Sequence, residues 1–259
     1  MANSPKKLKQ VGSALTLPNS NVPTVPDGWA DKFAQYVEKT RSASDSFEGW
    51  DWISSKGGTF QYMESLIGKE LEVIVLGATR ENQHYQGEYD PTKPGVPDCW
   101  ALDGTQGEGE PLQPTNVPEP WSDVCEGCQK NEWGSGKRRG KACRNYVRLA
   151  MVRANDPSGS GLRFRIPPTG VGAWSKFAKK LENGLGRPLF SVVTKLVIKP
   201  KGGSFTVVPE LISFVNDEET LEVLASRVEE ANVELLRVFE PREDDDAPKE
   251  QEESAGAAF

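Results

Sequence analysis

The chain has 259 residues, of which 36% are hydrophobic, with 25 glycines and 19 prolines. This composition is typical of a loop-rich globular protein with one sizeable core. No apolar run reaches 18 residues and the amino terminus has no hydrophobic secretory segment, so a soluble, cytoplasmic protein is expected. The net charge of −7 is unevenly distributed, because residues 1–215 sum to +4 while residues 216–239 and 240–259 sum to −5 and −6.

The first part of the chain, residues 1–65, is expected to be an N-terminal arm with a short helix. Residues 1–25 are polar and proline-spaced, which predicts a mobile arm. Asp27 is placed to cap the helix that follows. The aromatic pair Trp50 and Trp52 is not assigned to an element by its pattern.

Five later segments read as β-strands, with a helix between the third and the fourth. They are residues 70–80, 144–153, 162–166, 189–199 and 204–215, and the helix carries Trp174 and ends near Gly184. This order matches the connectivity of an OB-fold. We therefore expect a mainly β protein with α elements: a five-stranded OB-fold barrel over residues 66–215, a C-terminal helix over 216–239 and a disordered acidic tail over 240–259.

An insertion at about residues 85–143 separates the first two predicted strands and carries all four cysteines. They are Cys99, Cys125, Cys128 and Cys143, with the spacing C-x25-C-x2-C-x14-C. Two thiolates separated by two residues can bind one tetrahedral ion, and Gly127 suits the tight turn between them. Two disulfides or four buried free thiols are the alternatives, but disulfides are rare in reducing cytosol. The spacing therefore predicts one structural Zn²⁺ per chain, since four thiolates leave no position for water.

Basic residues are concentrated directly after the third cysteine. Residues 129–180 contain thirteen basic residues and two acidic ones, which indicates a polyanion as the ligand. Two neighbouring alternating strands are expected to present four arginines and a tyrosine on one surface: Arg144, Tyr146 and Arg148 from the first strand, and Arg163 and Arg165 from the second. The residues expected to contact DNA are Lys137, Arg138, Arg139, Lys141, Arg144, Tyr146, Arg148, Arg163, Arg165, Lys176, Lys179 and Lys180.

Three tryptophans, Trp100, Trp133 and Trp174, are candidates for stacking on bases, although such residues more often belong to a core. The acidic tail, with Asp244, Asp245 and Asp246, ends in Phe259 and has too little apolar content to fold. We expect this tail to compete with DNA for the basic surface and to bind a partner protein.

The cysteine block CEGCQKNEWGSGKRRGKAC, the strand order and the tail EPREDDDAPKEQEESAGAAF together resemble a bacteriophage single-stranded-DNA-binding protein. The resemblance covers about residues 66 to 259. It implies structural zinc within an OB-fold, a tail that recruits a polymerase, helicase or nuclease, a role in phage DNA replication, recombination or repair, and a location in the cytoplasm of the infected bacterial host. The chain departs from this pattern in ending with Ala258-Phe259 where bacterial tails end with Pro-Phe. It also has four cysteines where the best-known phage zinc site has one histidine and three cysteines.

An enzyme is not expected. The one histidine, His84, leaves little material for a nucleophilic triad, and it is read as a solvated loop residue although it could replace a cysteine ligand. A phosphate-binding loop is not expected, because the segment GSGKRRGKA lacks the required spacing. A nuclease is not expected either, because no further acidic cluster accompanies Asp98 and Asp103. A zinc-ribbon transcription factor that binds duplex DNA or polymerase is the alternative function, and a strand-annealing recombination protein is the second.

Overall fold

A computed structural model describes residues 50–63, 65–86, 97–104, 110–115 and 117–237. The chain divides into two compact units. The first comprises Met1–Thr79 and Tyr146–Leu235, and the second comprises Arg80–Asn145 and Leu236–Phe259. No helix in the described ranges is long and apolar enough to cross a membrane. The predicted N-terminal helix and the acidic tail lie outside the described residues.

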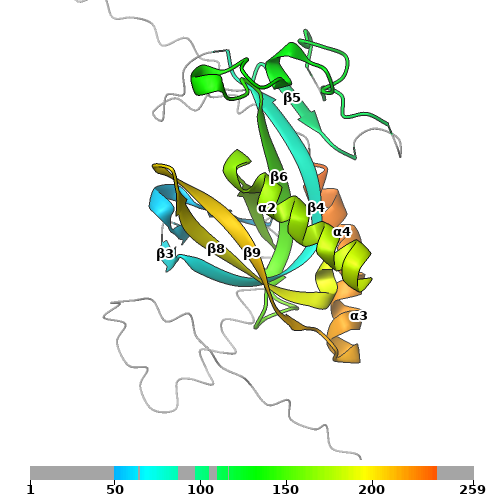
Figure 1. Cartoon of the computed structure of the whole chain (residues 1–259). Coiled ribbons are helices and arrows are strands. Elements are labelled where there is room, and N and C mark those ends of the chain that lie inside the picture. The colour runs from blue at the N-terminus through cyan, green and yellow to red at the C-terminus, as the bar shows by residue number, and fades with distance from the viewer. Residues whose placement is uncertain (1–49, 64, 87–96, 105–109, 116, 238–259) are drawn as a thin grey trace, which may run out of the picture. The chain divides into compact units, whose positions relative to one another are not determined.

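The protein is mainly β (Figure 1). The strands are β1 (Asp51–Ser54), β2 (Phe60–Tyr62), β3 (Ser65–Gly68), β4 (Glu70–His84), β5 (Cys99–Leu102), β6 (Arg144–Arg153), β7 (Leu162–Ile166), β8 (Val192–Lys201) and β9 (Ser204–Phe214). Eight of them follow the order β3-β2-β1-β7-β6-β4-β8-β9, and β5 pairs with the end of β4. The helices are α2 (Pro168–Lys179), α3 (Glu218–Ser226) and α4 (Val228–Leu235). A π turn (Lys180–Gly184) extends α2, and 3-10 turns cover Lys56–Gly58, Gln129–Asn131, Lys137–Arg139 and Leu189–Ser191.

The five predicted strands are all present, and four of their pairings define the first unit. β6 pairs antiparallel with β7, β4 antiparallel with β8, and β8 antiparallel with β9, while β4 and β6 are neighbours. The turn between β8 and β9 is the predicted one, because Gly202 and Gly203 have φ angles of 53° and 78°, which a tight two-residue hairpin turn requires. Strand β8 begins at Val192, since the three preceding residues form a 3-10 turn.

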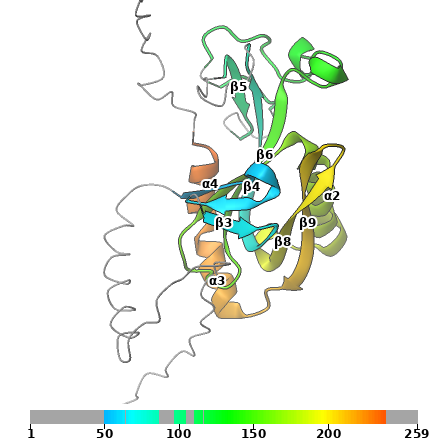
Figure 2. The same cartoon turned by 90° about the vertical axis from the view of Figure 1, so that its left-hand side faces the viewer.

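The two faces of the first unit's sheet bury different cores. Alternate residues of β6 and β7, such as Leu149 and Phe164, pack with Trp174 of α2 on the inner face. On the outer face, Ala150 and Val152 pack with Leu235 and other residues of α3 and α4. Figure 2 shows α2 and the α3–α4 pair on opposite sides of these strands. Both faces of β6 are thus covered over its second half, where simple alternation ends.

Three predictions about the elements are wrong. Residues 51–65 are not part of an arm, because β1, β2 and the start of β3 extend the sheet, with β1 parallel to β7. The C-terminal helix is two helices, which break at Arg227. β4 continues to His84 instead of ending at residue 80, because its polar residues find partners: Glu81 accepts hydrogen bonds from Gln83 and Trp100 at 2.8 Å each.

Candidate functional site

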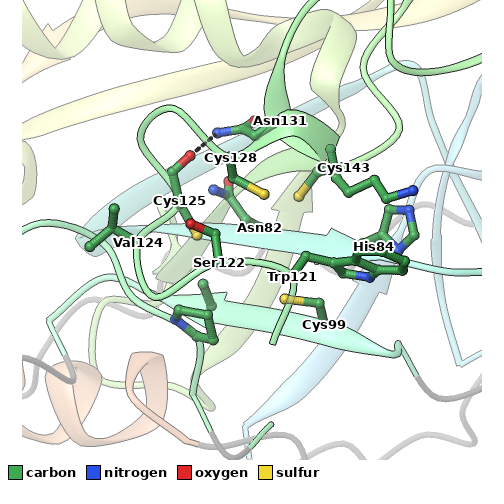
Figure 3. A pocket seen from close by; sticks show the side chains of 13 residues that line it. Asn82, His84, Cys99, Trp121, Ser122, Val124, Cys125, Cys128, Asn131 and Cys143 are labelled. Carbon is green, nitrogen blue, oxygen red and sulfur yellow. Dashed lines mark hydrogen bonds between the residues drawn. The ribbon is translucent and has the colours of Figure 1, made fainter. Parts of the chain in front are cut away.

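All four cysteines lie in the second unit and line one cavity (Figure 3). The floor of the cavity is the β4–β5 pair, in which Asn82 lies opposite Ala101 and His84 lies opposite Cys99. Cys125 and Cys128 come from the loop after β5, and Cys143 directly precedes β6. All four are free thiols. The spacing of the cysteines therefore predicted their convergence correctly.

The backbone of the loop is shaped for two closely spaced ligands. Gly127 has φ +73°, the left-handed conformation that a non-glycine residue adopts only with strain, and this reverses the chain between Cys125 and Cys128. Cys125 N–H donates to the carbonyl of Leu112 at 2.7 Å, and Cys143 N–H donates to the carbonyl of Lys130 at 2.7 Å. These hydrogen bonds attach two of the cysteines to the rest of the unit.

Burial disfavours the thiolate form of these side chains. It raises the pKa of Cys99 and of Cys125, and raises the pKa of Cys143 to about 12, while the negative charges of neighbouring thiolates add to each shift. A divalent cation would reverse this effect, because a metal-bound thiol is deprotonated. In the part of the chain that the structure describes, no three His, Cys, Asp or Glu side chains already form a metal-binding group. The cysteines thus share a cavity without forming a complete ligand shell.

A network of asparagine side chains, two of which line the cavity, connects its walls. Asn131 donates from Nδ2 to the carbonyl of Cys125 at 2.9 Å, and its Oδ1 accepts from Asn145 at 3.0 Å and from Lys141 at 3.1 Å. Asn145 also donates to Oδ1 of Asn82. Outer hydrogen bonds of this kind orient the groups that bind a metal, so this network is the second layer of the candidate site.

His84 is not a solvated loop residue, so that prediction is wrong. It is the last residue of β4, it is only 6% exposed, and it lines the same cavity as the thiols. Its Nδ1 lies 2.8 Å from Oδ1 of Asp98, and Trp121 donates to the other carboxylate oxygen at 3.0 Å. Asp98 thereby fixes the orientation of the imidazole ring. A fifth side chain capable of binding a metal is present beside the four cysteines.

The outer face of β1, β7 and β6 in the first unit carries a cluster of aromatic and basic side chains, which we call the arginine face: Trp52, Tyr146, Arg148, Arg163 and Arg165. Arg148 and Arg165 are cross-strand partners, as are Arg163 and Trp52. The guanidinium carbon of Arg165 lies 4.5 Å from the centre of the Tyr146 ring and 5.8 Å from that of Trp52. The alternation of β6 and β7 therefore places Tyr146, Arg148, Arg163 and Arg165 on one face, and β1 adds Trp52 to it.

The end of α4 contacts two of the arginines. Arg163 donates to Oε1 of Glu234 at 2.7 Å and to the carbonyl of Trp50 at 2.8 Å, and Glu234 is only 7% exposed. Arg148 donates to the carbonyl of Leu235 at 3.3 Å. Arg163 thus has an internal counter-charge, and the guanidinium group of Arg165 lies against two aromatic rings.

Other predicted contact residues are not on this face. Lys176, Lys179 and Lys180 are exposed on α2 and the turn after it, and α2 packs on the inner side of the sheet. Lys137, Arg139, Lys141 and Arg144 belong to the second unit, as does the backbone of Arg138, whose side chain is outside the described part. The predicted contact residues therefore belong to several elements of both units.

Two of the three candidate stacking residues are wrong. Trp100 is 3% exposed and donates to Glu81, and Trp174 is 4% exposed in the core, so neither ring can receive a base. Trp133 is 80% exposed. The sequence pattern missed Trp52, which is 44% exposed on the arginine face. Alternation of exposed Trp52 with buried Ile53 would have been the signal, but the strand is only four residues long.

Comparison with known proteins gives no relative: no protein family, curated protein or solved structure matches this chain.

Proposed function

We propose that the protein binds single-stranded DNA without sequence preference and protects unpaired strands during phage DNA replication, recombination or repair. The observation that carries this proposal is the arginine face, in which the guanidinium group of Arg165 lies against the rings of Tyr146 and Trp52. Proteins that bind single strands combine basic side chains for phosphates with aromatic rings on which bases stack. Both components occur here within one sheet face.

The pairing of like charges supports an anionic ligand. Arg148 and Arg165 are directly opposite each other on neighbouring strands. The Cβ atoms of directly opposite residues are about 5 Å apart, so the two positive side chains belong to one small area of the face. A phosphate bound there could contact both guanidinium groups. The face therefore offers concentrated positive charge to a polyanion.

The aromatic side chains favour an unpaired strand. Trp52 is 44% exposed, and Tyr146 is half-buried beneath Arg165. A base that stacks on such a ring contributes about 1 to 3 kcal/mol, and only an unpaired base is free to do so. Duplex DNA would offer phosphates to this face but no accessible base planes.

We interpret the first unit as an OB-fold that is extended at one edge. The pairings β7-β6-β4-β8-β9 and helix α2 between β7 and β8 are those expected for this fold. Among the described strands, β7 pairs next with β1 rather than with β9. Strands β1 to β3 thus take the place at which a simple five-stranded barrel would close, and β1 adds Trp52 to the binding face.

The second part of the proposal is one structural Zn²⁺ held by Cys99, Cys125, Cys128 and Cys143. Their common cavity and the asparagine network around it support this ligand set. Cys128→Ser is expected to lose the metal, measured by elemental analysis of purified protein. Metal-free wild-type protein whose cysteines all react readily with an alkylating reagent would contradict the proposal.

The acidic tail, residues 240–259, is proposed to recruit a replication or repair protein through Phe259 and to compete with DNA. The tail follows α4, whose last residues already contact Arg163 and Arg148. Phe259→Ala is expected to lose the partner while leaving DNA affinity nearly unchanged. A variant that retains the partner would refute the role of this residue.

The face is tested by the double variant Arg148→Ala/Arg165→Ala, assayed by anisotropy of a labelled oligonucleotide across a salt series. Two lost phosphate contacts should reduce the log–log salt slope by about 1.4, at 0.7 per contact with a single strand. Lys199→Gln is the matched control, because this lysine is already paired with Glu210 at 2.7 Å. Unchanged affinity and slope in the double variant would show that the face is wrongly assigned.

A further inference from the structure

The loop between Cys128 and Cys143 in the second unit exposes a large aromatic side chain. Trp133 is 80% exposed, more than any other large hydrophobic residue that the structure describes. Tryptophan is costly to expose to water, since its ring has a large apolar area. Packing within the unit does not account for its position.

Hydrogen bonds within the loop hold Trp133 in place. The hydroxyl of Ser135 donates to the carbonyl of Glu132 at 2.7 Å and accepts from Ala142 N–H at 3.0 Å. The N–H groups of Gly134 and Gly136 both donate to the carbonyl of Gly140, at 3.1 and 2.9 Å. The exposed indole is therefore presented by an ordered loop, which lowers the entropy cost of binding a ligand.

The charge of the loop fits an anion. Residues 129–144 contain six basic residues and one acidic residue, in a chain whose net charge is −7. Lys141 lies 5.8 Å from the centre of the Trp133 ring, and Lys137 and Arg139 are exposed. Arg139 has φ +62°, a left-handed conformation that is strained for an L-residue and that glycine adopts freely. A basic side chain stands at this position despite the strain.

The two ends of the loop meet at the thiol cavity. Cys128 and Cys143 line the same cavity, and Cys143 N–H donates to the carbonyl of Lys130 just after Cys128. A metal bound to both sulfur atoms would fix the base of the loop and hence the position of Trp133. Metal binding at the cavity would therefore add to the hydrogen bonds that order this surface.

We propose that this loop is a second, metal-dependent contact for unpaired nucleic acid, in which Trp133 stacks on a base while Lys137, Arg139 and Lys141 contact the adjoining phosphates. The proposal rests on the proposed function and adds a second binding surface to the arginine face. Each of the two units then has its own aromatic and basic surface. Only the surface on the second unit requires the metal.

The test measures binding of full-length protein to a labelled mixed-sequence oligonucleotide, single-stranded and duplex, at one salt concentration. Trp133→Ala is expected to weaken single-strand binding about 5- to 100-fold, the range given by one lost stacking contact, and to change duplex binding by less than about twofold. Trp133→Phe should retain most of the affinity, because it keeps a ring. Leu185→Ala, an exposed apolar residue of the first unit, is the control and should match wild type.

Metal removal supplies the second arm of the experiment. Chelated wild-type protein should lose about as much single-strand affinity as Trp133→Ala, and Trp133→Ala should then have no further effect. If Trp133→Ala matches the control while Trp52→Ala weakens binding, the second contact is overturned and the arginine face stands. Equal losses on duplex and single strand would overturn stacking on an unpaired base. Wild-type protein that binds no single strand would instead refute the proposed function.

Discussion

Asn131 offers the sharpest test of the metal site, because it supports the ligands without being one. Its side chain makes three hydrogen bonds, to the carbonyl of Cys125 and from Asn145 and Lys141. At about 0.5 to 1.5 kcal/mol each, in a half-buried position, Asn131→Ala should cost about 2 to 3 kcal/mol of local stability. Loss of such an outer hydrogen bond also weakens metal binding, by about 10- to 100-fold.

The assay is a competition titration of Zn²⁺ against a chromophoric chelator, with thermal unfolding measured in the presence and absence of metal. Asn131→Asp separates the contributions of the individual hydrogen bonds, because its carboxylate still accepts from Lys141 but cannot donate to the carbonyl of Cys125. Gln129→Ala is the matched control, an exposed residue of the same 3-10 turn. The reasoning fails if Asn131→Ala binds Zn²⁺ within about twofold of this control.

Three further predictions concern the helix, a tyrosine and the tail. Gly170→Ala should destabilise the protein in chemical denaturation, because the new Cβ atom would lie 2.8 Å from the Val207 carbonyl oxygen. Gly172→Ala in the same helix meets no atom within 4 Å and should stabilise the protein by about 0.5 to 1 kcal/mol. Equal effects of the two substitutions would contradict this packing. Burial raises the pKa of Tyr62 from 10.0 to about 12, so the stability that the neutral hydroxyl contributes should be complete below pH 10 and be lost as the pH rises to about 12. Tyr62→Phe should remove this pH dependence of stability, measured by urea titrations. Deleting residues 240–259 should tighten DNA binding most at low salt, where screening is weakest, and weaker or unaltered binding there would exclude competition by the tail.

The strands foreseen from the sequence are those with regular alternation. β7 alternates buried and half-buried residues along its whole length, as predicted. β6 does so only up to Leu149, because α3 and α4 then cover its outer face and Ala150 and Val152 are also buried. Strands β1 to β3 were missed, since segments of three or four residues are too short to show a period.

The residues of the candidate site were also only partly predictable from the sequence. Cysteine spacing carries its own geometric meaning, so the common cavity of the four thiols was predictable. His84 was not, because it follows Glu81, Asn82 and Gln83, and such a polar run reads as a loop. Two of these buried side chains have hydrogen-bond partners far away in the chain: Asp98 lies 14 positions from His84, and Asn145 lies 63 positions from Asn82.

The most direct test of single-strand binding is a titration of wild-type protein with the same mixed-sequence oligonucleotide in single-stranded and duplex form, across a salt series in one buffer. The proposed function predicts tighter binding to the single strand at every salt concentration, because bases add stacking to the phosphate contacts. It also predicts that this preference survives at high salt, where the phosphate contribution is weakest. Tighter binding to the duplex, or equal affinities that disappear together as salt rises, would contradict the proposed function and favour a duplex-binding zinc protein.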